Sequence, residues 1–131
     1  MENEKIISFI SDRKHYDIPI SDILYVFMKK QDAYVHISDG SILKTRMTFA
    51  EFEEILGENF IRIHRGCLVS AMAIHSVGRL ITLSNGDSLE YSAQHRGEII
   101  EKFRLKQRVI IDNLADNDNP ADNEAYHEHY K

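Results

Sequence analysis

The sequence lacks most features that mark secreted or membrane-embedded proteins. Its single cysteine, Cys67, excludes an internal disulfide framework and favours a reducing compartment. No run approaches the roughly 20 apolar residues that span a bilayer. The N-terminus, MENEKIISFI, carries two glutamates and is unlike a signal or transit peptide. We therefore expect a cytoplasmic protein that does not insert into a membrane.

Motifs of common enzyme chemistry are also absent. The sequence contains no CxxC, HExxH, GxGxxG or GxxxxGK[ST], so zinc, dinucleotide and P-loop sites have no support. No GxSxG is present, and no carboxylate stands at a spacing that would orient His64 as a catalytic base. His127 and His129 could chelate a metal, but in so polar a segment a solubilising role fits better. We expect no enzyme, no cofactor and no metal site.

Strong net charge is absent from most of the chain. The formal charge is −5, but residues 112–131 hold six of the 21 acids and one of the 16 bases. Residues 1–111 are therefore neutral, which is not the basic balance typical of nucleic-acid binders, although local clusters of cations matter more than the sum. We predict one folded domain over residues 1–111 and an acidic, disordered tail over 112–131. The tail either keeps the protein soluble or competes with DNA for nearby cations.

Short strands dominate what is present. Alternating or wholly apolar runs predict strands, and the pairs Asp39-Gly40 and Asn85-Gly86 predict tight hairpin turns. The run ILYVFM, residues 23–28, is typical of a strand buried on both faces. The expected strands are 5–10, 15–20, 23–28, 33–38, 41–46, the stretch around 59–70, 73–77, 79–84 and 87–92. The fold class is mainly β.

Two helices complete the predicted architecture. Thr48 and Glu51 form an S/T-x-x-E capping box, and Gly57 is a plausible stop. We expect the buried face of this helix to hold the apolar side chains Phe49, Phe52, Ile55 and Leu56, with Met47 stapled onto Phe52. A second helix is expected from about Ala93 or Gln94 to about Arg108.

Three polar, partly basic segments each follow an apolar or alternating strand. They are Lys29-Lys30-Gln31-Asp32, His64-Arg65-Gly66 and Ser92-Ala93-Gln94-His95-Arg96. Such side chains contact phosphates and read base edges in the major groove. Taken singly, each segment fits an ordinary solvated turn better. Together they would form a site if the fold brought them to one edge.

The segment NFIRIHRGCLVS, residues 59–70, makes the sequence recognisable. It resembles the recurrent segment of the LytTR family of bacterial DNA-binding domains, in which F-x-R-x-H-[RKN]-[SG] leads into an apolar turn, usually with V-N. The resemblance covers residues 5 to about 106, because the hairpin with the following helix (23–56) and the late hairpin ITLSNGDSLEYS also occur in the family's order. It implies an elongated β architecture with one central capped helix and a C-terminal helix, whose loops enter successive major grooves.

The resemblance also implies which residues contact DNA. The implied set is Lys29, Lys30, Gln31, Asp32, Ala33, Arg62, His64, Arg65, Gly66, Ser70, Ser92, Gln94, His95 and Arg96. Arg65 takes the base-reading position, and Gly66 lets the backbone approach the phosphates closely. Ser70 stands where the family usually has Asn, and Ala93-Gln94 where it often has two arginines. With fewer cations, binding should be weaker and less salt-dependent than in a typical member.

The resemblance implies a function in transcription. We expect sequence-specific binding to duplex DNA at promoter direct repeats, with a homodimer on DNA or a regulatory protein as a further partner. The chain starts only a few residues before the first strand, which leaves no room for the phospho-receiver of most members and predicts a free-standing, response regulator-like protein. The alternative is a protein-interaction module that antagonises another regulator and has partly lost DNA binding. Salt-dependent binding to duplex DNA separates the two.

Overall fold

The fold is a row of three antiparallel β-sheets with two helices. The computed structural model describes residues 5–115, and the side chains of residues 5–106. Its strands are β1 (Ile6–Ser11), β2 (Lys14–Pro19), β3 (Ile23–Lys29), β4 (Asp32–Ile37), β5 (Ile42–Thr45), β6 (Phe60–His64), β7 (Cys67–Ser70), β8 (Ile74–Val77), β9 (Ile81–Leu83) and β10 (Ser88–Leu89). The helices are α1 (Phe49–Leu56) and α2 (Arg96–Ala115). The predicted mainly β class is confirmed.

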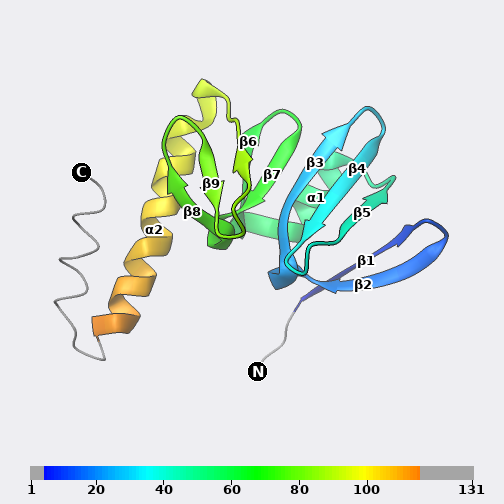
Figure 1. Cartoon of the computed structure of the whole chain (residues 1–131), viewed down its shortest axis with the longest axis horizontal. Coiled ribbons are helices and arrows are strands. Elements are labelled where there is room, and N and C mark those ends of the chain that lie inside the picture. Colours follow the sequence, from blue (N-terminus) through cyan, green and yellow to red (C-terminus); the bar gives the residue numbers. More distant parts are fainter. Residues whose placement is uncertain (1–4, 116–131) are drawn as a thin grey trace.

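The sheets lie side by side along the long axis (Figure 1). The hairpin β1-β2 stands at one end, the five-stranded sheet β5-β4-β3-β7-β6 occupies the middle, and β10-β9-β8 lies next to α2 at the other end. Both turn predictions hold. Gly40 has φ 96° in the β4–β5 turn and Gly86 has φ 99° in the β9–β10 turn, conformations that cost glycine little.

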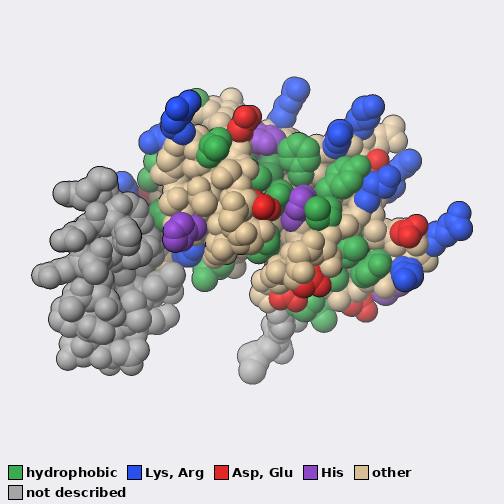
Figure 2. Space-filling model, viewed as in Figure 1, with side chains coloured by type: hydrophobic (Ala, Val, Ile, Leu, Met, Phe, Trp, Pro, Cys, Tyr) green, Lys and Arg blue, Asp and Glu red, His purple; other side chains and the backbone are tan. Residues whose placement is uncertain are grey.

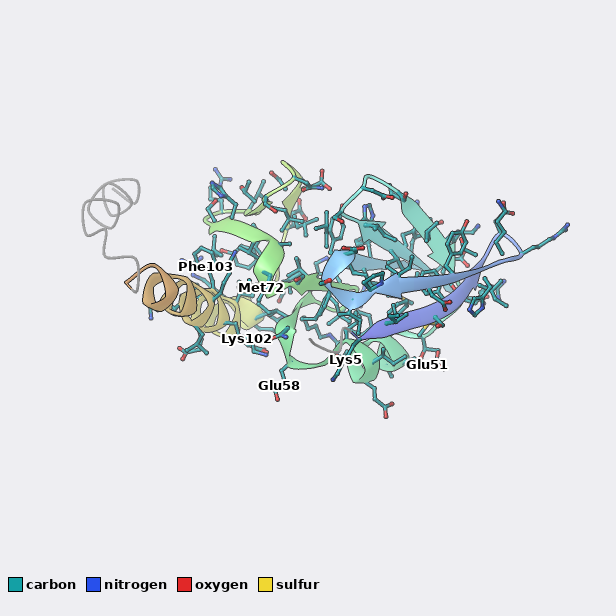
Figure 3. All side chains as sticks on the ribbon, turned by 90° about the horizontal axis from the view of Figure 1, so that it is seen from below. Lys5, Glu51, Glu58, Met72, Lys102 and Phe103 are labelled. Atoms are coloured by element: carbon teal, nitrogen blue, oxygen red, sulfur yellow. The ribbon has the colours of Figure 1, made fainter. Side chains whose placement is uncertain are left out.

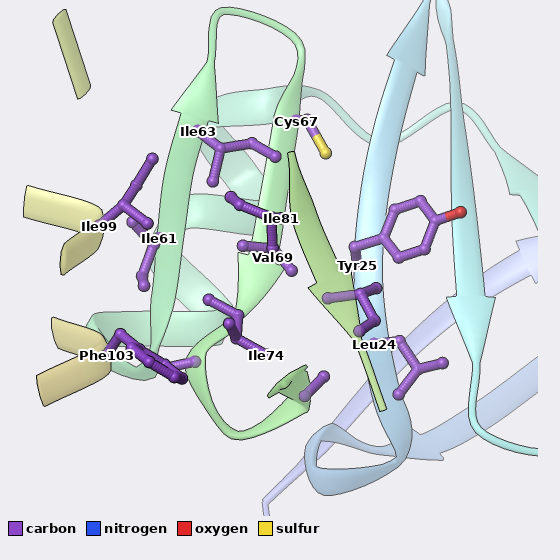
Figure 4. Packing of buried hydrophobic residues seen from close by; sticks show 13 residues of the cluster. Leu24, Tyr25, Ile61, Ile63, Cys67, Val69, Ile74, Ile81, Ile99 and Phe103 are labelled. Atoms are coloured by element: carbon purple, nitrogen blue, oxygen red, sulfur yellow. The ribbon is translucent and has the colours of Figure 1, made fainter. Parts of the chain in front are cut away.

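The central sheet separates two apolar cores. Along β3, Tyr25 belongs to one core and Val26 to the other, as the period of two requires. The first core lies between this sheet, the three-stranded sheet and α2, and Figure 4 shows it. It contains Ile61, Ile63, Val69, Ile74, Ile81, Ile99 and Phe103 among others. The second core lies under α1 and the β1-β2 hairpin and includes Ile7, Val35, Phe52 and Leu56.

The predicted capping box fixes the start of α1. The Thr48 hydroxyl accepts the Glu51 backbone N–H at 3.1 Å, and the Glu51 carboxylate accepts the Thr48 N–H at 2.8 Å. Gly57 ends the helix with φ 78°, as expected. The predicted apolar face was too wide, because Ile55 is 40% exposed. Only Phe52 and Leu56, one turn apart, are buried in this eight-residue helix.

Helix α2 is longer than predicted and is fastened to the body by two lysines. It ends at Ala115 rather than near Arg108, so residues 112–115 of the predicted tail are helical, and residues 116–131 lie outside the described part. Lys102 donates to the Glu58 carbonyl at 2.8 Å, and Lys106 to the Ile74 carbonyl at 2.5 Å. Figure 3 shows Lys102 at this junction. In the described residues, no helix is long and apolar enough to cross a membrane.

Candidate nucleic-acid interface

The three polar segments lie along one edge of the molecule. In Figure 1 the β3–β4 tip, the β6–β7 tip and the segment leading into α2 all point to the upper side. Two backbone hydrogen bonds connect neighbouring segments. Met28 N–H donates to the Gly66 carbonyl at 2.7 Å, and Ser92 N–H donates to the Ile63 carbonyl at 2.8 Å. We call these three segments, residues 29–32, 64–66 and 92–96, the tip edge.

Lysine and arginine side chains project along this edge (Figure 2). Its exposed cations are Lys29, Lys30, Arg65 and Arg96. The Asp32 carboxylate is neutralised by Arg46, whose Nε lies 3.3 Å away. Although the folded body is neutral in sum, the fold therefore gathers cations on one side, as phosphate contact requires.

The β3–β4 tip carries a strained lysine. Lys30 has φ 59°, a left-handed conformation that residues other than glycine adopt at a cost of about 1 kcal/mol or more. The conformation belongs to the tight connection between Lys29 and Asp32, which are the last paired residues of the two strands. Lys29, Lys30 and Gln31 are exposed. The strained connection thus carries two adjacent exposed ammonium groups, those of Lys29 and Lys30, at the end of the hairpin.

Three hydrogen bonds hold the backbone of the Arg65-Gly66 turn. Gly66 N–H donates to His64 Nδ1 at 3.0 Å, and the Gly66 carbonyl accepts from Met28. The Arg65 carbonyl accepts a longer hydrogen bond from Arg62 Nη2 at 3.4 Å. The Arg65 side chain is exposed. A fixed backbone under a free guanidinium is the arrangement that direct reading of a base requires.

Arg62, one of the implied DNA contacts, is not a free cation. Its guanidinium lies 4.6 Å from the centre of the Phe49 ring and 3.8 Å from a Glu53 oxygen, both on α1. Together with its hydrogen bond to Arg65, these contacts connect α1 to the β6–β7 turn. Arg62 therefore supports the turn, and its availability to DNA is reduced.

The third segment is a short 3-10 turn, Ala93–His95, that leads into α2. The Ser92 hydroxyl accepts the Gln94 N–H at 3.3 Å and so caps this turn. Arg96 Nη1 donates to the Tyr91 hydroxyl at 2.6 Å, and Tyr91 donates in turn to the Gly78 carbonyl. Gln94 and Arg96 are exposed, whereas His95 is half-buried and its Nδ1 has no partner among the described atoms.

Two predicted contact residues have no accessible side chain. Ala33 is fully buried against the second core, and Ser70 is 9% exposed at the far end of β7. Period-2 alternation turns Ala33 inward on β4, whereas Ser70 belongs to β7, a strand that is buried on both faces. Any part they play is therefore in shaping the sheet below the tips.

Sequence reasoning missed two aromatic residues of the site. Phe27 is 37% exposed, although the run ILYVFM was expected to be buried on both faces. Its ring lies edge-on to the His64 ring, with the two ring centroids 6.0 Å apart. Tyr91 holds Arg96, as described above. The signal for Phe27 was its place one residue before the basic tip. For Tyr91 the signal was its place next to Ser92.

The titration of His64 depends on this packing. Burial lowers the pKa of His64, and the nearby His95 and Arg65 lower it further, while Glu90 acts in the opposite direction. The neutral imidazole is thus the favoured form near neutral pH. In the part of the chain that the structure describes, no group of three or more His, Cys, Asp and Glu could hold a metal ion.

Comparisons with known proteins agree with the fold. A family model for the LytTr DNA-binding domain matches residues 13–104. A solved structure, the LytTr DNA-binding domain of a methyl-accepting/DNA response regulator from Bacillus cereus, is similar in fold with a TM-score of 0.67 and 20% identity. The similarity covers 76% of this chain and 97% of that one. No curated protein matches the sequence.

Proposed function

The chain belongs to the LytTR family of DNA-binding domains, and from this premise we propose that it recognises promoter DNA through the tip edge. The three tips would enter successive stretches of major groove on one face of a duplex. Arg65 would read a base, and Lys29, Lys30 and Arg96 would contact phosphates. Two copies on a direct repeat would regulate transcription of the adjacent gene.

The observation that carries the proposal is the pair of backbone hydrogen bonds that join the tips. Met28 to Gly66 and Ser92 to Ile63 place three sequence-distant polar segments in one row. Three independent solvated turns need not be connected by hydrogen bonds, nor need their exposed cations lie on the same side. Preorganised loops also avoid the entropy cost of ordering on binding.

The experiment is a binding measurement at several salt concentrations. A duplex enriched by the protein from a random pool would be compared with a shuffled duplex by fluorescence anisotropy. With four exposed cations, the slope of log K against log salt should be no steeper than about −4. Arg65→Ala should reduce discrimination between the two duplexes by about 1–3 kcal/mol, as for a bidentate contact with guanine.

Lys14→Ala provides a matched control. Lys14 is exposed on the β1-β2 hairpin, which lies away from the tip edge, so its removal should leave the slope and the discrimination unchanged. Enrichment of no sequence together with the absence of salt-dependent binding would contradict the proposal. That outcome would favour the protein-interaction module instead.

A further inference from the structure

The His64 side chain lies inside the turn that it precedes. Its Nδ1 is 3.0 Å from the backbone nitrogen of Gly66, and its ring stands edge-on to Phe27 with planes inclined by 81°. The β6–β7 pairing is also irregular between Arg62 and His64, so regular alternation ends at this residue. Gly66 lies in the turn outside both strands, and its N–H is paired with the His64 side chain.

This contact defines the protonation state of the ring. A backbone N–H can only donate, so Nδ1 must be the unprotonated nitrogen and the proton of the neutral ring lies on Nε2. Adding a second proton would place a donor on Nδ1, directly opposite the Gly66 N–H. The hydrogen bond would then be lost and the turn would have to move.

We propose that His64 is a positioning residue for Arg65: the neutral ring holds the turn in the shape that presents Arg65, and protonation of the ring releases it. The inference rests on the proposed function, in which Arg65 reads a base. It gives His64 a different part from that of a DNA contact. Selectivity for sequence should consequently weaken in acid, although the added positive charge favours binding to any DNA.

The groups that face His64 support a transition below neutral pH. Arg65 on the turn and His95 before α2 disfavour a further positive charge, and Glu90 after β10 favours it. Burial against Phe27 and the strand ends, the largest effect, acts in the same direction as Arg65 and His95. Because the folded pKa is depressed, the folded state prefers neutral His64. This contribution is complete above the unfolded pKa of about 6.5 and is lost as pH falls toward the folded pKa.

One arm of the test uses the free protein. Nitrogen-15 NMR of the full chain should show an unprotonated Nδ1 on His64 at about pH 7.5. The Gly66 amide resonance should move together with the titration of His64. Observation of a proton on Nδ1 at that pH, or a Gly66 amide that ignores the titration, overturns the inference without reference to DNA.

The second arm measures selectivity with the enriched and shuffled duplexes. As the pH is lowered from about 7.5 to about one unit below the midpoint of the His64 titration seen by NMR, the ratio of their affinities should fall about tenfold for the unaltered protein. His64→Phe keeps an aromatic ring but removes the acceptor, so its ratio should be low at both values. His64→Asn offers an amide oxygen near the place of Nδ1 and does not titrate. It should recover most of the selectivity that His64→Phe loses, with no dependence on pH.

Controls separate failure of this inference from failure of the proposed function. His75→Asn, at an exposed position on β8, should behave as the unaltered protein does. If Arg65→Ala removes selectivity but His64→Asn still responds to pH, the inference fails and the proposed function stands. If Arg65→Ala changes nothing, the proposed function fails, and the NMR arm still decides whether His64 holds the turn.

Discussion

The Tyr25 ring stacks on the His36 imidazole, with ring centroids 4.0 Å apart and planes inclined by 13°. The same Tyr25 donates its hydroxyl to the Asp87 carboxylate at 3.2 Å. Asp87 lies in the β9–β10 turn, where its N–H donates to the Asn85 side chain. The hydrogen bond from Tyr25 to Asp87 therefore joins the central sheet to the three-stranded sheet. Burial and the adjacent Asp87 raise the pKa of Tyr25, so the hydroxyl remains a donor.

Tyr25→Phe removes the hydroxyl that makes this connection and keeps the aromatic ring. We expect a loss of about 1 kcal/mol of unfolding free energy, as for one partly buried hydrogen bond. Urea unfolding monitored by circular dichroism provides the measurement. Tyr34→Phe is the control, since its hydroxyl makes no hydrogen bond within the described part of the chain and its replacement should leave stability unchanged. Equal effects of the two substitutions would contradict the assignment.

Lys30→Gly should separate stability from binding. Glycine accommodates φ 59° without strain but loses more backbone entropy on folding, so stability should rise by no more than about 1 kcal/mol. Binding should weaken, with the salt slope reduced by about one unit. Arg13→Gly relieves the same strain at φ 67° in the β1–β2 turn. Arg13→Gly should give the same gain in stability and leave DNA binding unchanged. Weaker DNA binding by this variant would count against the tip edge as the DNA-binding surface.

Arg62→Ala tests whether Arg62 supports the turn or contacts phosphate. Loss of the Phe49 and Glu53 contacts should lower stability by about 1 kcal/mol. Affinity should fall because the Arg65 carbonyl loses its donor, yet the salt slope should stay the same. A slope shallower by about one unit would instead identify a phosphate contact. Comparison with Lys30→Gly, measured in the same way, calibrates that change.

Gly66→Ala examines how closely the backbone approaches DNA. A Cβ at Gly66 would lie 3.5 Å from the Met28 carbonyl oxygen, which is ordinary contact, and φ is not in the left-handed range. The thermal midpoint should therefore remain close to that of the unaltered protein, because the free energy of unfolding should change by less than about 0.5 kcal/mol. If the phosphates approach this backbone, affinity for the enriched duplex should nevertheless fall. Unchanged affinity would show that the glycine is not needed for DNA.

The fold was largely predictable because local signals and global packing agree. The hairpin at Gly40 and the capping box at Thr48 each rest on chemistry within a few residues, and both are found. The length of α2 was not predicted: the helix continues beyond Arg108 through the mostly apolar stretch VIIDNLA to Ala115. The burial of Ala33 follows from the alternation of Ala33, Val35 and Ile37 along β4, which the sequence already shows, although the family resemblance implied a contact with DNA.

The candidate site was predictable as three segments, but the contacts that hold these segments were not. Arg65 and its neighbours were recognisable from their order along the chain, and they do lie on one edge. The attachment of Arg62 to Phe49 depends on where α1 packs, a contact between residues that are distant in sequence. The hydrogen bond from Gly66 N–H to His64 lies next to a local irregularity in strand pairing, and the alternating sequence pattern shows neither feature.

The two cores share the central sheet as a common wall. Strand β3 sends Tyr25 into one core and Val26 into the other, and β7 does the same with Val69 and Leu68. Neither half can lose its packing without exposing one side of the strands that support the other. We therefore expect this elongated molecule to unfold cooperatively, as one unit. Slow hydrogen exchange should then extend through β3 and β7 to both cores alike.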